Sequence, residues 1–250
     1  MTLSTHEQHW LEAIQRARAE RRTLPSGSLP PPLDLTGAYR VQAALRGDRQ
    51  LIGYKLGLVS PSKQAQMGLT APITGWLSAD MLHQSSVVLN HFLQPRIEPE
   101  VAAVLQADIP PDATPGRALL AVGAWLLAVE ILDSIWEGYH FTAPEVVADN
   151  ASGGAILLGE RALDWPFDGE LRLTINGQDV AAGPIAALGD LPAQLCWLAQ
   201  QVGGLHTGQV IMFGSPAPAV SLHPGTVALL GPASATLVFA VTQHEEKSNG

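Results

Sequence analysis

The sequence predicts an α+β fold in which two N-terminal helices precede a larger region of short strands. Apolar side chains recur at helical spacing twice within residues 1–50. From Leu51 onward the pattern changes to short β-favouring runs interrupted by glycine and proline. We therefore expect a helical segment over residues 1–50 and one larger domain over residues 51–243.

The two N-terminal helices are separated by a proline-rich linker. The first is expected over residues 5–22, capped by Thr5, with four apolar side chains on one face: Trp10, Leu11, Ile14 and Ala17. Residues 24–35 combine proline with serine and glycine, which predicts a linker or an extended arm. A second helix should then run to about Arg46, with Asp34 or Thr36 as its N-cap.

The rest of the chain is expected to be mainly strands joined by tight turns. Residues 51–58, 87–92 and 97–105 read as strands, and residues 117–125 are compatible with a helix. Residues 126–133 are ambiguous between a helix and a buried strand. Asn176-Gly177 predicts a hairpin turn. A helix over residues 189–203 precedes three final strands.

Composition excludes several classes of protein. The chain has 250 residues, of which 46% are apolar and 15% charged, as expected of a globular protein. A net charge of −9 argues against a nucleic-acid partner. A single cysteine, Cys196, excludes an internal disulfide and fits the reducing cytoplasm. No run approaches the roughly 18 apolar residues of a membrane span, so no membrane association is expected.

Glu98 and Glu100 form an unusual pair of like charges. On a strand, side chains two residues apart point to the same face, and an apolar run follows directly. Two carboxylates there are costly unless a cation lies between them, and a hard divalent metal is the simplest such cation. An exposed edge strand with a charged outer face is the alternative, and Pro99 is compatible with it.

Two further charges lie in apolar surroundings. Glu130 is the one charged residue in the run 118–132, where an unpaired carboxylate would be expensive to bury. A third metal ligand explains it better than solvent exposure does. Lys55 lies in the middle of a predicted strand, so it either extends to solvent or is buried beside an anionic partner. Gly53 and Gly57 favour burial, because they permit close approach of the backbone.

Five motifs carry a resemblance to a known family. They are, in chain order, Gly53-Tyr54-Lys55-Leu56-Gly57-Leu58; Gln66-Met67-Gly68 with Pro72-Ile73-Thr74-Gly75; Gln94-Pro95-Arg96-Ile97-Glu98-Pro99-Glu100; Val129-Glu130-Ile131-Leu132-Asp133-Ser134; and Val147-Ala148-Asp149-Asn150-Ala151-Ser152. Together they resemble the bacterial 2-oxo-alkenoate hydratase and 4-oxalocrotonate decarboxylase family of the fumarylacetoacetate hydrolase superfamily. The resemblance extends over about residues 51–241.

The resemblance implies a fold, a cofactor and a set of site residues. The fold would be a mixed β-roll-like sheet domain of the fumarylacetoacetate hydrolase C-terminal type with an N-terminal helical segment. The cofactor would be Mg²⁺ or Mn²⁺. The implied roles are metal ligands Glu98, Glu100 and Glu130; catalytic Lys55 with Asp80 as its acidic partner; and substrate-binding Leu56, Gly57 and Ser152.

The chain also departs from the family pattern in two places. Many relatives have Asp-Ser-Arg where this chain has Asp133-Ser134-Ile135, which puts the recognition of a second substrate carboxylate in doubt. Relatives have a Thr-Gly pair where this chain has Phe213-Gly214-Ser215. Neither departure affects the three glutamates.

The resemblance implies a metal-dependent lyase of aromatic hydrocarbon catabolism acting on a 2-oxo acid. The metal would stabilise the dienolate formed when 2-oxohex-3-enedioate (4-oxalocrotonate) loses CO₂, which is the reaction we favour. Hydration of 2-hydroxypenta-2,4-dienoate is the alternative, since residues 94–96 and 151–153 look more like the hydratase branch. Hydrolysis through His140 and Glu145, or a degraded partner subunit, is less favoured. A homo-oligomer, or a complex of hydratase and decarboxylase, is expected.

Overall fold

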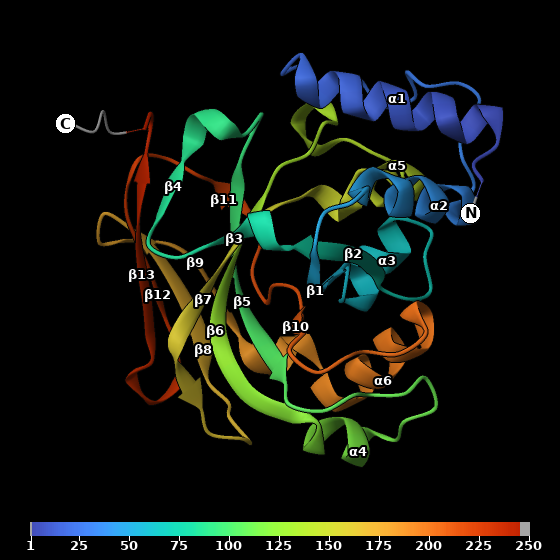
Figure 1. The fold of residues 1–250 in the computed structure, drawn as a ribbon. Helices are drawn as coiled ribbons and strands as arrows, with labels where there is room; N and C mark the ends of the chain where they lie inside the picture. The colour runs from blue at the N-terminus through green and yellow to red at the C-terminus, as the bar shows by residue number, and fades with distance from the viewer. Residues whose placement is uncertain (1, 246–250) are drawn as a thin grey trace.

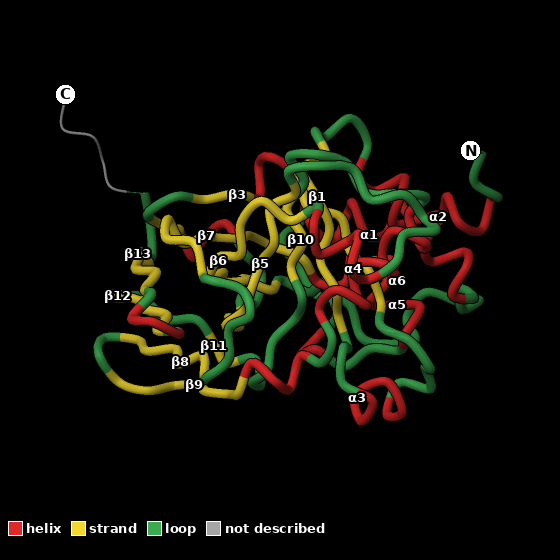
Figure 2. The backbone as a smooth tube through the Cα atoms, turned by 90° about the horizontal axis from the view of Figure 1, so that it is seen from below, coloured by secondary structure: helices red, strands yellow, loops and turns green. Residues whose placement is uncertain are grey.

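The structure is a computed structural model that describes residues 2–245, and it confirms the α+β class (Figure 1). Helices gather at the end of the molecule where the chain begins, and strands β12 and β13 lie at the opposite end (Figure 2). No helix in the described part of the chain is both long and apolar enough to cross a membrane.

Helices α1 (Thr5–Ala19) and α2 (Leu35–Arg46) form the N-terminal segment, coloured blue in Figure 1. Ser4, not Thr5, caps α1, because its side chain accepts the Glu7 N–H while Glu7 reaches back to the Ser4 N–H. Asp34 caps α2. Both helices bury their apolar faces in a core shared with strands of the larger sheet.

The larger sheet is mixed and has eight strands. Its bounds are β1 (Leu51–Gly57), β2 (Ile73–Ser78), β3 (Leu82–His83), β5 (Arg96–Leu105), β6 (Val122–Leu132), β7 (Gly153–Leu163), β10 (Val210–Met212) and β11 (Val220–Ser221). Their order is β2-β1-β10-β5-β6-β7-β3, with β11 paired to β5. The β1–β10 and β3–β7 pairs are parallel and the other pairs are antiparallel.

The smaller sheet has five strands in the order β4-β13-β12-β8-β9. Its bounds are β4 (Ser86–Val88), β8 (Glu170–Ile175), β9 (Gln178–Pro184), β12 (Gly225–Leu230) and β13 (Thr236–Thr242). Asn176 and Gly177 join β8 to β9 with φ angles of 52° and 77°, which confirms the predicted hairpin turn. Apolar side chains from both sheets share one core.

Four further helices cover the sheets: α3 (Pro61–Gln66), α4 (Pro115–Leu120), α5 (Ala143–Ala148) and α6 (Leu191–Val202). The prediction of a helix through residue 125 is wrong, because α4 ends at Leu120 and β6 begins at Val122. The ambiguous stretch 126–133 lies mostly in β6. Most of its side chains are buried on both faces of the strand, so apolar periodicity could not identify it.

Candidate functional site

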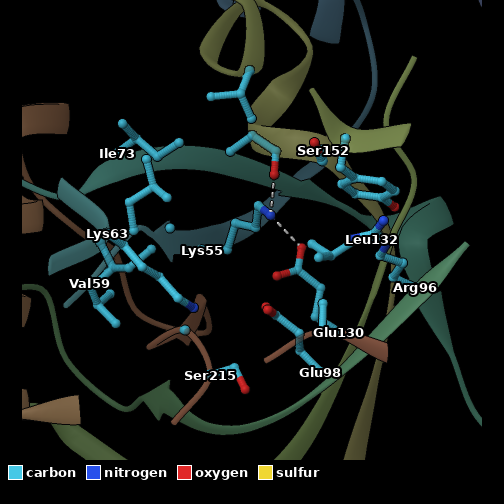
Figure 3. Close-up of a pocket in the computed structure, with 18 of the residues that line it drawn as sticks. Lys55, Val59, Lys63, Ile73, Arg96, Glu98, Glu130, Leu132, Ser152 and Ser215 are labelled. Carbon is cyan, nitrogen blue, oxygen red and sulfur yellow. Dashed lines mark hydrogen bonds and ion pairs between the residues drawn. The ribbon is translucent and has the colours of Figure 1, made fainter. Parts of the chain in front are cut away.

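The pairing of β5 with β6 brings the three predicted metal ligands together. Glu98 is the direct cross-strand partner of Glu130, and Glu100 lies two residues further along β5. One carboxylate oxygen from each of the three lies within 4.8 Å of the others. Glu98 and Glu130 point into the same pocket in Figure 3. The expected clustering of Glu98, Glu100 and Glu130 is therefore present.

The surroundings of the three glutamates fit a divalent cation. Glu100 and Glu130 are buried, and Oε1 of Glu100 has no hydrogen-bond partner among residues 2–245. Its other oxygen accepts the Gly214 N–H at 2.9 Å. Burial and the charges of Glu130 and Glu98 raise the pKa of Glu100 well above its ordinary value. An oxygen-liganded dication would remove this repulsion and occupy the unpaired oxygen.

Metal binding at this cluster should depend on pH. Burial and the charge of Glu130 raise the pKa of Glu98 from 4.5 to about 7. The folded carboxyl thus keeps a proton that the unfolded chain has lost, so the metal-free protein should lose stability as pH rises from 4.5 to about 7. A cation must displace that proton, so the apparent Kd for Mg²⁺ should weaken about tenfold per pH unit below pH 7.

Titration calorimetry of the metal-stripped protein at about pH 6 and about pH 8 measures this dependence. The expected result is tighter binding and a smaller proton release at the higher pH. Equal Mg²⁺ affinity at both values would contradict the raised pKa of Glu98.

Lys55 projects from β1 into the same pocket and is buried. Its Nζ lies 2.6 Å from Oε1 of Glu130 and donates to the Ala151 carbonyl at 2.5 Å (Figure 3). Gly75, its partner on β2, leaves room for it, since a Cβ there would lie 3.1 Å from Lys55 Cε. The close approach expected at Gly53 is also present, because a Cβ there would meet the Val210 carbonyl oxygen.

A turn of left-handed residues supplies the second acceptor for Lys55. Asn150, Ala151 and Ser152 have φ angles of 51°, 51° and 58°, which non-glycine residues rarely adopt. Asn150 holds the turn to β2, accepting the Trp76 N–H at 2.8 Å and donating to the Trp76 carbonyl at 3.0 Å. The Ser152 hydroxyl is buried beside the pocket without a hydrogen-bond partner in the described part of the chain. It is thus available to a ligand.

The pocket has a volume of about 450 Å³ and joins these groups to an apolar wall. Its lining includes Leu56, Gly57 and Ser152, the three positions implied as substrate-binding. The apolar part of the lining is larger: Leu58, Val59, Met67, Ile73, Leu132, Phe141 and Val146. A flat, conjugated carbon chain fits such a wall, with its polar end against the glutamates and Lys55.

Two cations of the pocket were not identified from the sequence. Lys63 reaches in from α3, and Arg96 stands at the start of β5. Arg96 lies two residues before Glu98 on the same strand, and that spacing places it on the face of the glutamates. This signal was available in the sequence. Lys63 carried none, because its position depends on how α3 folds back over β1.

The expected role of Asp80 is corrected by the structure. Asp80 lies in a 3₁₀ turn (Ala79–Met81), is 64% exposed, and faces Arg49 at 3.8 Å. It does not line the pocket of Lys55. Gly75 is the residue of β2 beside Lys55, and Asp80 follows five residues later, roughly 15 Å along an extended chain. Glu130 takes the position of acidic partner.

Two further positions considered in the sequence, Ile135 and the pair His140 and Glu145, have other roles in the structure. Ile135, where relatives often have arginine, is fully buried in the core and does not line the pocket. His140 and Glu145 do not form a water-activating pair. Glu145 instead accepts from Ser26 and Gly27 of the linker, and His140 is exposed beside the Glu137 carbonyl.

Known proteins resemble this chain along most of its length. Residues 60–236 match the fumarylacetoacetate (FAA) hydrolase C-terminal family. A 4-oxalocrotonate decarboxylase of Pseudomonas sp. is 34% identical over 200 residues, covering 75% of each chain. A 2-keto-4-pentenoate hydratase of Paraburkholderia phymatum is 30% identical over 235 residues, covering 84% of this chain and 87% of the relative.

A solved structure is also similar. The 4-oxalocrotonate decarboxylase from Pseudomonas putida G7, complexed with magnesium and adipate, superposes with a TM-score of 0.87 at 27% identity. The match covers 96% of this chain and 100% of that one. The sequence match, the fold and the glutamate cluster agree, and the chain belongs to the fumarylacetoacetate hydrolase C-terminal family.

Proposed function

We propose that this protein is a divalent-metal-dependent lyase that decarboxylates 2-oxohex-3-enedioate to 2-hydroxypenta-2,4-dienoate. The observation that supports it most is the pocket that Lys55, Glu98 and Glu130 line beside an apolar wall, with Glu100 completing the carboxylate cluster. The decarboxylase relatives, including one structure with magnesium and adipate, a six-carbon diacid, add support.

The three glutamates would hold Mg²⁺ or Mn²⁺, and the bound ion would supply Lewis-acid polarisation of the substrate's keto oxygen. Lys55 donates one N–H to the Ala151 carbonyl and forms an ion pair with Glu130. An N–H that these contacts leave free would serve the 2-oxo acid group of the substrate. Ser152 offers a hydroxyl to the same group. The apolar lining keeps water from the conjugated chain.

The reaction balances without any external oxidant or reductant. The C5–C6 bond breaks, and C6 leaves as CO₂. The electron pair of that bond passes through the C3–C4 double bond to the oxygen on C2. Protonation of that oxygen gives 2-hydroxypenta-2,4-dienoate, and Lys55, buried in the same pocket, would supply the proton.

Hydration of 2-hydroxypenta-2,4-dienoate is the second candidate, because a hydratase relative covers more of this chain than the decarboxylase does. A degraded partner subunit is less well supported. The three carboxylates are costly to bury, and a chain without metal chemistry has no reason to retain them.

The test is to incubate the purified protein with Mg²⁺ and each substrate in turn. We expect CO₂ from 2-oxohex-3-enedioate, with activity lost in Lys55→Met and retained in Lys63→Met. If only 2-hydroxypenta-2,4-dienoate reacts, as measured by loss of its diene absorbance, the protein is a hydratase. No turnover of either substrate, together with no Mg²⁺ binding, would refute the lyase proposal.

We further propose a cytoplasmic location and a homo-oligomer, or a complex of decarboxylase with hydratase subunits. Relatives named for successive steps on the same carbon skeleton support the pairing. Sedimentation velocity of the protein, alone and with a hydratase, measures both assemblies.

A further inference from the structure

Arg96 is a cation of the pocket that the proposed chemistry does not use. It lies on β5 two residues before Glu98, which places its Cα roughly 7 Å from that of Glu98 at the rise of a strand. Figure 3 shows Arg96 and Lys63 on opposite sides of Glu98 and Glu130. Arg96 thus stands at one end of the pocket, at a fixed spacing from the metal ligands.

The guanidinium of Arg96 is held in place without a carboxylate partner among residues 2–245. It lies 4.1 Å from the centre of the Tyr139 ring, and its one hydrogen bond, to the Gly138 carbonyl, is long at 3.4 Å. Stacking uses the flat face of the guanidinium and leaves the N–H fork at its edge available.

The Tyr139 support is itself fixed. Its hydroxyl donates to the Gln94 carbonyl at 3.1 Å, so the ring is tied to the chain just before β5. Tyr139 adopts a left-handed φ of 65°, a conformation that persists in a non-glycine residue only where neighbouring contacts hold it. Arg96 is therefore presented to the pocket as a preformed receptor for a planar anion.

Charge and length indicate which anion fits. The cations Lys55, Lys63 and Arg96 balance the three glutamates, so a bound divalent ion leaves two positive charges in the site. Two carboxylates neutralise them. An extended six-carbon diacid separates its carboxyl carbons by roughly 6 Å, from C–C bonds of about 1.5 Å, which is close to the rise of two residues along β5.

We propose that Arg96, supported by Tyr139, binds the distal carboxylate of the substrate and makes this pocket selective for 2-oxo dicarboxylates. The inference rests on the proposed function, because it requires the 2-oxo acid end to occupy the glutamate cluster. Holding C6 at Arg96 fixes the C5–C6 bond relative to the conjugated chain. The same contact therefore governs both selectivity and the orientation of the bond that breaks.

The test uses two saturated acids that cannot decarboxylate by this route, 2-oxoadipate and 2-oxohexanoate, which differ only in the distal carboxylate. Their affinities for the Mg²⁺-loaded protein are measured by calorimetry. Wild type should bind 2-oxoadipate at least roughly tenfold more tightly. Arg96→Met should weaken the binding of 2-oxoadipate by roughly 10–100-fold and leave the affinity for 2-oxohexanoate within about twofold of the wild-type value. Arg96→Lys should restore part of the preference.

Lys63→Met is the matched control, because it removes a cation of the same pocket from the other side of the cluster. It should keep most of the preference for 2-oxoadipate and weaken it less than Arg96→Met does, because it lowers the charge of the site but leaves the guanidinium in place. If Arg96→Met weakens the binding of both acids equally, Arg96 contacts the 2-oxo acid end and the inference is overturned. An unchanged preference for 2-oxoadipate in Arg96→Met also overturns it. In both cases, Mg²⁺-dependent binding of 2-oxohexanoate leaves the proposed function standing. Absence of that binding in wild type refutes both.

Discussion

Glu100→Gln is expected to abolish Mg²⁺ binding and lower turnover by at least about a thousandfold, while making the metal-free protein more stable at alkaline pH. The two effects have one cause. Glu100 is fully buried between Glu98 and Glu130, and its pKa is raised by burial and by both neighbouring charges. A neutral amide removes that repulsion, but its uncharged oxygen is too weak a ligand to displace water from Mg²⁺ at this site.

The stability gain should be about 1–3 kcal/mol, the range seen when a costly buried ion is replaced by a neutral group. Urea denaturation in the presence of a chelator measures it, and repeating the denaturation with Mg²⁺ should reverse the order of wild type and variant. The Glu100 carboxylate accepts the Gly214 N–H, and the amide oxygen of glutamine can keep that hydrogen bond.

Glu7→Gln is the matched control, and its expected effect on stability is opposite to that of Glu100→Gln. Hydrogen bonds from Arg40 and the Ser4 backbone lower the pKa of Glu7 to about 2, so its charged form stabilises the fold. That stability is present above the ordinary pKa of 4.5 and is lost as pH falls toward 2. Glu7→Gln should therefore lower stability at neutral pH and leave Mg²⁺ binding unchanged. A Glu100→Gln variant that still binds Mg²⁺ at wild-type affinity would disprove the assignment of the metal centre.

The three glutamates of the cluster could be predicted from the sequence because each is an exception to a local rule. Glu98 and Glu100 put two like charges on one strand face, and Glu130 interrupts an apolar run. That Glu130 stands opposite Glu98 depends on the register between β5 and β6, which no local pattern contains. The sequence could therefore indicate which residues needed a cation, and the pairing of β5 with β6 brings them together.

The acidic partner of Lys55 could not be predicted in the same way. Asp80 and Glu130 were both available carboxylates, and the choice between them depends on where β2 ends relative to Lys55. Gly75 is the residue that faces Lys55, so the chain has left the pocket by the time it reaches Asp80. Arg96 and Lys63 illustrate the same limit. The spacing of Arg96 from Glu98 indicates a shared strand face, but only the fold shows that Arg96 and Lys63 both line the cavity.

The N-terminal segment also proved to be connected to the site, through Arg18 of α1. Arg18 donates to Asp149 Oδ1 at 2.6 Å and to the Asp133 carbonyl at 3.1 Å. Asp149 directly precedes the left-handed turn whose Ala151 carbonyl accepts from Lys55. The boundary between the helical segment and the larger domain at residue 50 stays a prediction. The contacts of Arg18 with Asp133 and Asp149 join the two sides of that boundary.

Arg18→Met should destabilise the protein by about 3–5 kcal/mol, the cost of removing one partner from a buried ion pair. Asp149 is fully buried and Asp133 nearly so, and burial raises the pKa of both, an effect that Arg18 opposes. Backbone N–H groups donate hydrogen bonds to both carboxylates, but they cannot neutralise the two negative charges. Urea denaturation at neutral pH measures the loss.

Arg22→Met is the control, because Arg22 forms an ion pair with Glu20 in which both side chains are about half exposed. That change should cost less than about 1 kcal/mol. A double variant, Arg18→Met with Asp149→Asn, should recover part of the lost stability, since the second change removes the charge that Arg18 had neutralised. Similar losses for Arg18→Met and Arg22→Met would mean that Asp133 and Asp149 do not need the charge of Arg18. The left-handed turn at residues 150–152 would then depend on the hydrogen bonds of Asn150 to Trp76.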